Sequence, residues 1–186
     1  TVGNAQISTS VKKYGTGSMS FDGSGDWLAS NTAQKQNFTF GTGNFTIEMW
    51  VYFNNVTNNM ALYDGRPSST NGAYNTIILD GSTSTIQYQA NTSIQITSAP
   101  VAASTWYHIA LCRAGTSTKL FINGTQQGST YSDSTNYIVA DNRPLIGSNG
   151  TNTSIFNMNG YIDDLRITKG YARYWENFTP PAAALP

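Results

Sequence analysis

The sequence predicts an all-β protein built as a two-sheet antiparallel jelly-roll sandwich. Short runs rich in Thr, Ile, Val, Tyr, Phe and Trp recur along the 186 residues, which is the composition of β-strands. Seven Asp-Gly or Asn-Gly pairs lie between these runs, and such pairs favour the tight turns of hairpins. No segment keeps a helical period for three turns, so crossover helices are not expected.

The predicted strands follow one another with turn residues between them. The clearest is Phe45–Phe53, where apolar side chains at odd positions alternate with polar or amphipathic ones at even positions, the period of a half-buried strand. The further runs of this kind are Ser18–Phe21, Trp27–Ser30, Met60–Tyr63, Thr76–Leu79, Thr85–Gln89, Ile94–Thr97, Trp106–Arg113, Lys119–Ile122, Leu145–Gly147 and Tyr161–Thr168. About eleven strands suit two sheets packed face to face, an arrangement that protects exposed strand edges.

A single domain is expected, because a chain of 186 residues fits one hydrophobic core of roughly 100 to 200 residues. We place this β-sandwich domain at residues 1–179. Within it, Gly170–Asn177 is the one segment that we expect to form a brief helical turn. Residues 180–186 are rich in Ala and Pro and are expected to form a C-terminal tail.

Strict alternation assigns the side chains of each predicted strand to one face of a sheet. In Phe45–Phe53 the odd-numbered residues then face the core, and Glu48, Trp50 and Tyr52 face outward. On the later strands the same rule sends Ile109, Leu111, Leu120, Ile122, Leu165 and Ile167 inward, and His108, Ala110, Cys112, Lys119, Phe121, Ile162, Asp164 and Arg166 outward.

The predicted outer face combines flat aromatic rings with hydrogen-bonding groups, which suits sugar rings. The candidate carbohydrate-binding residues are Trp50, Tyr52, Glu48, His108, Phe121 and Arg166. A competing interpretation is that Glu48, Asp164 and Arg166 neutralise one another in a salt-bridged cluster beneath covering loops. Trp50 would equally be buried by a loop in that case. Other candidate platforms are Tyr74, Tyr88, Tyr131 and Tyr137.

Charge and composition exclude several classes of function. Ten Lys and Arg balance ten Asp and Glu, and without a basic run no nucleic-acid partner is expected. No apolar stretch reaches the roughly 20 residues that span a bilayer, so no membrane insertion is expected. One cysteine, Cys112, and one histidine, His108, cannot build a tetrahedral zinc site or an internal disulfide.

Catalysis is not expected either. Glycoside hydrolysis needs two carboxylates flanking the scissile bond, and the two glutamates, Glu48 and Glu176, do not share a strand motif. A polysaccharide lyase would need a base and a charge-neutralising group, for which His108, Tyr52 and Arg166 are the residues present. A lyase or glycoside hydrolase therefore stays as an alternative to a non-enzymatic module.

Four stretches carry a resemblance to a known family: Tyr14–Leu28, Phe45–Val51, Trp106–Leu111 leading to Leu120–Gly124, and Gly160–Ile167. In this order they resemble the laminin-G-like group of the concanavalin A-like lectin/glucanase superfamily. The closing run Thr168–Tyr174, with Asn177–Pro181, is similar to laminin-G-like domains of bacteriophage tail and virion-surface proteins. The resemblance implies a sandwich with one concave sheet that often binds glycans or proteins, and sometimes calcium.

The resemblance also implies a metal site. Asp26 and Asp163 lie in the first and last motifs and are the expected ligands of a structural Ca²⁺, which prefers hard oxygen donors. The alternative is that such aspartates form turns and cap loop amides.

The expected function is a non-catalytic carbohydrate-binding or adhesion module of a virion or cell-surface protein. It would be a phage tail or fibre component that binds a host-surface glycan or a neighbouring virion or surface protein. The alternative is a structural decoration or spacer domain without a ligand. The sequence leaves the source, the glycan and the oligomeric state open.

Overall fold

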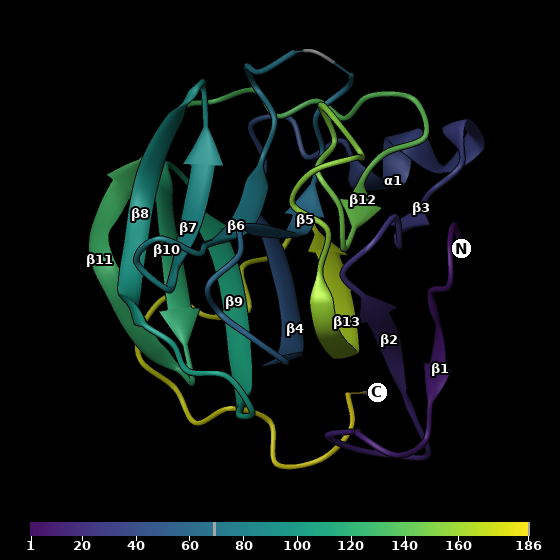
Figure 1. The fold of residues 1–186 in the computed structure, drawn as a ribbon. Helices are drawn as coiled ribbons and strands as arrows, with labels where there is room; N and C mark the ends of the chain where they lie inside the picture. Colours follow the sequence, from purple (N-terminus) through teal and green to yellow (C-terminus); the bar gives the residue numbers. More distant parts are fainter. Residues whose placement is uncertain (69, 186) are drawn as a thin grey trace.

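The computed structural model describes residues 1–68 and 70–185, and these residues form two antiparallel sheets (Figure 1). The seven-stranded sheet contains, in spatial order, β1 (Gln6–Ser8), β2 (Ser18–Asp22), β13 (Asn159–Lys169), β4 (Phe45–Phe53), β9 (Trp106–Ala114), β10 (Ser117–Ile122) and β11 (Thr125–Ser132). The six-stranded sheet contains β3 (Leu28–Ala29), β12 (Leu145–Ile146), β5 (Met60–Asp64), β6 (Thr76–Asp80), β7 (Thr85–Ala90) and β8 (Ser93–Pro100). The predicted all-β sandwich is confirmed.

Each predicted strand coincides with an observed one, and two observed strands were not predicted. The strand β1 is three residues long, too short for a period to show. The strand β11 is built of Thr, Gln, Ser and Gly with a single aromatic residue, so it lacks apolar alternation.

The expected helical turn at Gly170–Asn177 is wrong, since this segment holds bends without helix. The short helical turns of the structure are instead η1 (Thr32–Gln34) and α1 (Lys35–Phe38). The side chain of Asn31 caps the first of them by accepting from the Gln34 amide. No helix in the described residues is long and apolar enough to cross a membrane.

The core lies between the two sheets and follows the alternation of β4. Phe45, Ile47, Met49, Val51 and Phe53 are fully buried in it. The inward side chains of β9 and β10 join the same cluster, whereas Ala110, Cys112 and Phe121 form a separate small cluster on the outer face. On β4, β9 and β10 the two faces of the seven-stranded sheet are therefore arranged as alternation predicts.

The last strand breaks the alternation, and here one assignment is wrong. Ile162 was expected to face outward but lies in the core. On β13, Asp163 pairs with Trp50 and Arg166 pairs with Glu48, so β13 uses one residue more than β4 over this stretch. This β-bulge lies at Asp164, whose φ is 49°. It lets Ile162 and Leu165 face inward together.

After β13 the chain crosses the outer face of the seven-stranded sheet as an irregular segment, residues 170–185, which we call the C-terminal strap (yellow in Figure 1). The Phe178 amide donates to the Gly124 carbonyl. Farther along, the Pro181 carbonyl accepts from the Tyr14 hydroxyl, and the Leu185 amide donates to Asp164. Part of the expected tail, residues 180–186, therefore lies against the sandwich, while residue 186 is outside the described residues.

Candidate functional site

The strap covers most of the face on which the sequence placed a carbohydrate site. Glu48, His108 and Phe121 are fully buried and Trp50 is 6% exposed. The ring of Phe178 packs edge-on against both His108 and Phe121. The prediction that these four side chains are open to a ligand is wrong in this structure. The strap covers Glu48, His108 and Phe121, and Tyr14 and Lys13 lie against the ring of Trp50.

The charged residues of this face form the buried cluster of the competing interpretation. Glu48 Oε1 accepts from Arg166 Nε at 2.8 Å, and Oε2 accepts from the Tyr174 hydroxyl at 2.9 Å. His108 Nε2 lies 3.3 Å from Oε2 and Arg173 Nε lies 3.7 Å from Oε1. The cluster therefore joins β4, β9, β13 and the strap.

Asp164, which that interpretation also included, is not part of the Glu48 cluster. Its carboxylate accepts from the Leu185 amide instead.

Burial and hydrogen bonding act in opposite directions on the Glu48 carboxyl. Burial raises its pKa, but the contacts from His108, Arg166 and Tyr174 outweigh burial and hold the pKa below its usual value. Burial, and then the Glu48 charge, raise the pKa of Tyr174 to about 12. Tyr174 thus remains a hydrogen-bond donor to an ionised Glu48 at neutral pH.

Two of the six predicted residues keep exposed surface. Tyr52 is half-buried between the rings of Trp106 and Tyr161. The Arg166 side chain is 19% exposed but is committed to Glu48. The role of Tyr52 in sugar binding therefore stays a prediction, whereas Arg166 is held by Glu48.

The expected calcium ligands lie apart and accept from backbone amides. The Asp26 carboxylate accepts from the amides of Asn4 and Asp22. Asp163 accepts from those of Lys13, Tyr14 and Asp164. This arrangement favours capping of loop amides, and the calcium site stays an untested prediction.

The position of β13 shows how far apart Asp26 and Asp163 lie. Asn159 pairs with Asp22, next to Asp26, and Asp163 follows four residues later, roughly 13 Å along an extended strand. The two residues are therefore not expected to share one ion.

The hollow with the greatest volume of those described here is lined by α1 and by two loops, which are drawn in the upper part of Figure 1, and we call it the rim cavity. Its volume is about 710 Å³. It lies between α1, the loop from β5 to β6 and the loop from β11 to β12. Its lining residues are Lys35, Gln36, Thr39, Pro67, Ser68, Tyr74, Ile138, Val139, Ala140, Asp141, Asn142 and Arg143.

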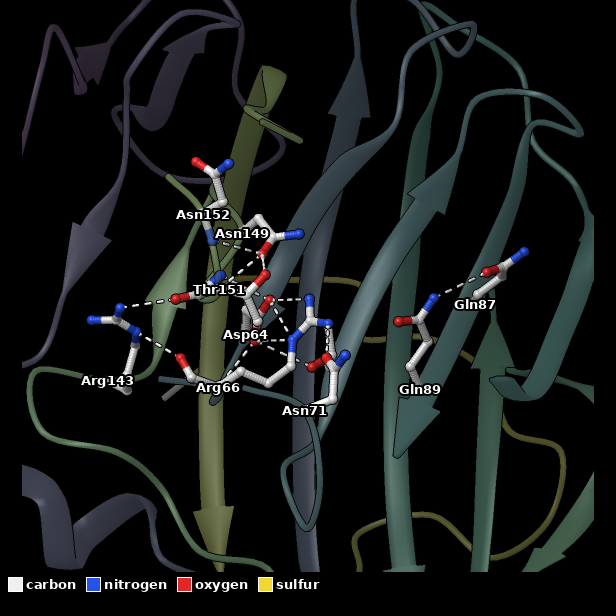
Figure 2. A network of polar contacts seen from close by, with 11 residues as sticks. Asp64, Arg66, Asn71, Gln87, Gln89, Arg143, Asn149, Thr151 and Asn152 are labelled. Carbon is white, nitrogen blue, oxygen red and sulfur yellow. Dashed lines mark hydrogen bonds and ion pairs between the residues drawn. The ribbon is translucent and has the colours of Figure 1, made fainter. Parts of the chain in front are cut away.

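A buried ion pair holds the loops beneath the rim cavity (Figure 2). Asp64, fully buried at the end of β5, accepts from Arg66 Nη2 at 2.5 Å, from the Gly150 amide at 2.9 Å and from the Thr76 hydroxyl at 3.2 Å. Arg143 then donates to the carbonyls of Arg66 and Gly150, at 2.8 and 2.9 Å. The Asp64 carboxylate therefore holds three loops together. It bonds Arg66 of the loop from β5 to β6 and Gly150 of the loop from β12 to β13, and Arg143 joins the loop from β11 to β12 to both of these residues.

Further polar side chains extend this network, and a separate glutamine pair lies apart from it in Figure 2. Arg66 Nη1 donates to Asn71, and Asn149 accepts from the amides of Thr151 and Asn152. On β7, at some distance in the picture, Gln89 donates to Gln87. The loops around the cavity are thus held by hydrogen bonds before any ligand arrives.

The rim cavity offers both surfaces that a sugar needs. The half-buried ring of Tyr74 and the exposed side chain of Ile138 are apolar. Lys35 of α1 and Asp141 of the loop from β11 to β12, joined at 2.8 Å, supply a donor and an acceptor. Of the four tyrosines named as alternative platforms, Tyr74 lines this cavity, whereas Tyr88 and Tyr137 are buried in the core.

Sequence reasoning missed this cavity because its residues come from three separate segments. Their one shared sequence signal is irregular, polar composition: Arg66-Pro67 and Asn71-Gly72 in one loop, and Asp141 to Pro144 in another. Such runs mark loops, but they do not say which loops meet.

The fold and its motifs agree with a family model. The laminin-G-type model described as the concanavalin A-like lectin/glucanases superfamily matches residues 22–173. The chain belongs to this superfamily. None of the curated proteins matches the sequence.

Solved structures share the fold at low sequence identity. A candidate carbohydrate-binding protein of Bacteroides ovatus is 14% identical with a TM-score of 0.60, over 80% of this chain and 42% of that one. Trypanosoma rangeli sialidase is 12% identical with a TM-score of 0.62, over 81% and 25%. The heptameric pentraxin of Limulus polyphemus is 17% identical with a TM-score of 0.57, over 80% and 73%. The chain thus spans less than half of the first two proteins.

Proposed function

We propose that this superfamily member is a non-catalytic carbohydrate-binding module and that the rim cavity is its ligand site. The observation that carries the proposal is the meeting of an aromatic ring, apolar loop residues and paired polar groups in one open hollow of about 710 Å³. Ligand sites are concave, partly apolar and equipped with a few placed polar groups. The carbohydrate-binding description of one structural neighbour supports the same class of ligand.

Each wall would contribute one kind of contact. The face of Tyr74 would cover the C–H groups of a pyranose, while Asp141 and Lys35 would accept from and donate to its hydroxyls. Arg143 is held by the carbonyls of Arg66 and Gly150, so it would shape the floor. Pre-organised loops reduce the entropy lost on binding.

The absence of catalysis is part of the proposal. Hydrolysis of a glycosidic bond needs two carboxyl groups roughly 5 to 9.5 Å apart. Among the described lining residues of the rim cavity, Asp141 is the one carboxylate, and Lys35 pairs with it. A lyase or hydrolase would be recognised by the release of reducing or unsaturated sugar ends from a polysaccharide.

We further propose that the module works at a virion or cell surface, within a phage tail or fibre protein. The support is the resemblance of Thr168–Tyr174 and Asn177–Pro181 to such domains, together with a low charge content of 11%. Neighbouring genes for tail or virion structural proteins are the expected observation. A gene set for intracellular metabolism would contradict this setting.

Glycan-array screening followed by calorimetry tests the ligand site. We expect the protein to bind one class of glycan, and Tyr74→Ala to weaken that binding roughly tenfold or more, because the ring face is lost. Tyr171→Ala is the matched control, since Tyr171 is 56% exposed on the strap and does not line the rim cavity. Circular dichroism should show both variants folded.

Two outcomes would contradict the proposal. No glycan binding by the wild type would favour the structural spacer. Binding that Tyr74→Ala leaves unchanged would place the glycan elsewhere on the molecule.

A further inference from the structure

A smaller hollow lies on the outer face of the seven-stranded sheet, where the strap passes β9 and β10. Its volume is about 240 Å³. The lining residues are Cys112, Ala114, Ser117, Lys119, Tyr174 and Trp175. Drug-sized ligands usually occupy roughly 300 to 1,000 Å³, so this hollow has room for one ring and not for a chain of several.

The strap holds Trp175 outward on a firmly anchored turn. On one side Tyr174 stacks on Phe178, with ring centroids 3.6 Å apart and planes within 6°. On the other side the Asn177 side chain accepts from the Gln126 amide at 2.8 Å. Trp175 itself stays 56% exposed. Because the residues on both sides of Trp175 are held in place, the exposed part of its indole forms a fixed apolar surface.

Lys119 places a positive charge on the same hollow. Its ammonium donates to the Trp175 carbonyl at 2.7 Å, and it has no carboxylate within ion-pair distance among the described residues. An ammonium carries three donors, so two remain for a ligand.

One negative charge lies close to the hollow: Glu48 bonds Tyr174 and acts on Cys112. Arg166 and Arg173 lie against that carboxylate and offset its charge. Glu176 lines a neighbouring hollow of about 170 Å³ and not this one. Burial raises the pKa of the Cys112 thiol to about 11, so the floor carries no thiolate at neutral pH. Ser117 adds a neutral hydroxyl to the wall.

We propose that this hollow is a second sugar site, which takes one pyranose ring that carries a carboxylate. The ring would stack on Trp175 and the carboxylate would pair with Lys119, while Ser117 would bond a hydroxyl. The inference extends the proposed carbohydrate-binding function, on which it rests for the class of ligand, to a site remote in sequence from the rim cavity. It also names the charge of the sugar.

Titration by NMR with glucuronic acid, and with glucose as the uncharged match, tests the proposal. We expect glucuronate to shift the indole N–H signal of Trp175, assigned with Trp175→Phe, with a dissociation constant in the roughly millimolar range of single sugars. Glucose should bind roughly tenfold or more weakly, because a hydrogen bond to a charged group is lost. Lys119→Met should remove the preference for glucuronate, and Lys119→Arg should keep it.

The remaining variants separate this site from the rim cavity. Trp175→Ala should abolish glucuronate binding, whereas Tyr74→Ala should leave the Trp175 signal responsive. Equal shifts with glucose and glucuronate, or no shift of the Trp175 signal, would overturn the second site. Either result is compatible with the proposed ligand site in the rim cavity, provided that glycan binding still depends on Tyr74.

Discussion

The carboxylate of Glu48 ties two parts of the chain together through single contacts. It bonds Arg166 of β13 and Tyr174 of the strap, at 2.8 and 2.9 Å. Burial of an ionised carboxylate is costly unless such partners satisfy it. The ionised Glu48 therefore adds its own contribution to the contacts that hold the strap on the sheet, such as that between Phe178 and Gly124.

Glu48→Gln should lower the free energy of unfolding by about 3 kcal/mol at pH 7, because it leaves Arg166 without its charge partner. The pKa of Glu48 is lowered in the folded state, so its contribution is present above the unfolded pKa of about 4.3 and is lost as the pH falls through the folded value. Urea unfolding at pH 7 and near pH 3 should show the difference between wild type and variant shrinking in acid.

The exposed residue Glu176 is the control for this measurement. Glu176→Gln should change the free energy of unfolding by no more than about 0.5 kcal/mol, as for most surface substitutions. A loss in Glu48→Gln that is equally large near pH 3 would show that charge pairing is not its cause.

At the scale of elements, two hairpin turns differ in what lies against them. Gly115, between β9 and β10, and Gly124, between β10 and β11, both have positive φ, 58° and 77°. A Cβ on Gly115 would meet nothing within 4 Å, whereas one on Gly124 would lie 1.8 Å from the Phe178 carbonyl oxygen. The turn at Gly124 is thus the place where the strap packs against the hairpin between β10 and β11.

Gly115→Ala should cost about 1 to 2 kcal/mol, the strain of a left-handed alanine. Gly124→Ala should cost more, because the strap must also move away. Hydrogen exchange is the decisive measurement: the Phe178 and Arg173 amides, bonded to Gly124 and Thr46, should exchange faster in Gly124→Ala and unchanged in Gly115→Ala. Equal exchange in both variants would show that Gly124 does not hold the strap.

The elements that the sequence predicted are those whose signal is local. In Phe45–Phe53 a period of two determines both the strand and its buried face, since neighbouring side chains point to opposite sides. The bulge at Asp164 is not visible in such a period, because an extra residue is decided by pairing with β4. That is why Ile162 was placed on the wrong face.

At the scale of the whole molecule, packing between distant segments determines which side chains of the outer face are exposed and where a cavity forms. Alternation put Trp50 and His108 on the outer face correctly, but the exposure of His108 depended on whether Phe178 would return to cover it, and that of Trp50 on whether Tyr14 would. The rim cavity depends similarly on α1 and two loops that meet at one end of the sandwich. Contacts between distant segments leave no period in the sequence, so the sequence predicted the fold but not which loops meet at the rim cavity.

Calcium binding would be visible in the stability of the whole molecule. An ion at about 100 times its dissociation constant stabilises the fold by about 2.7 kcal/mol, which would raise the Tm of a chain this size by roughly 5 to 10 °C. Because Asp26 and Asp163 accept from backbone amides of separate segments, we expect the same Tm in EDTA and in millimolar Ca²⁺. Mg²⁺ at equal ionic strength controls for screening. A Tm raised by Ca²⁺ alone, and no longer raised in Asp26→Asn or Asp163→Asn, would restore the expected metal site and require these carboxylates to leave their amides.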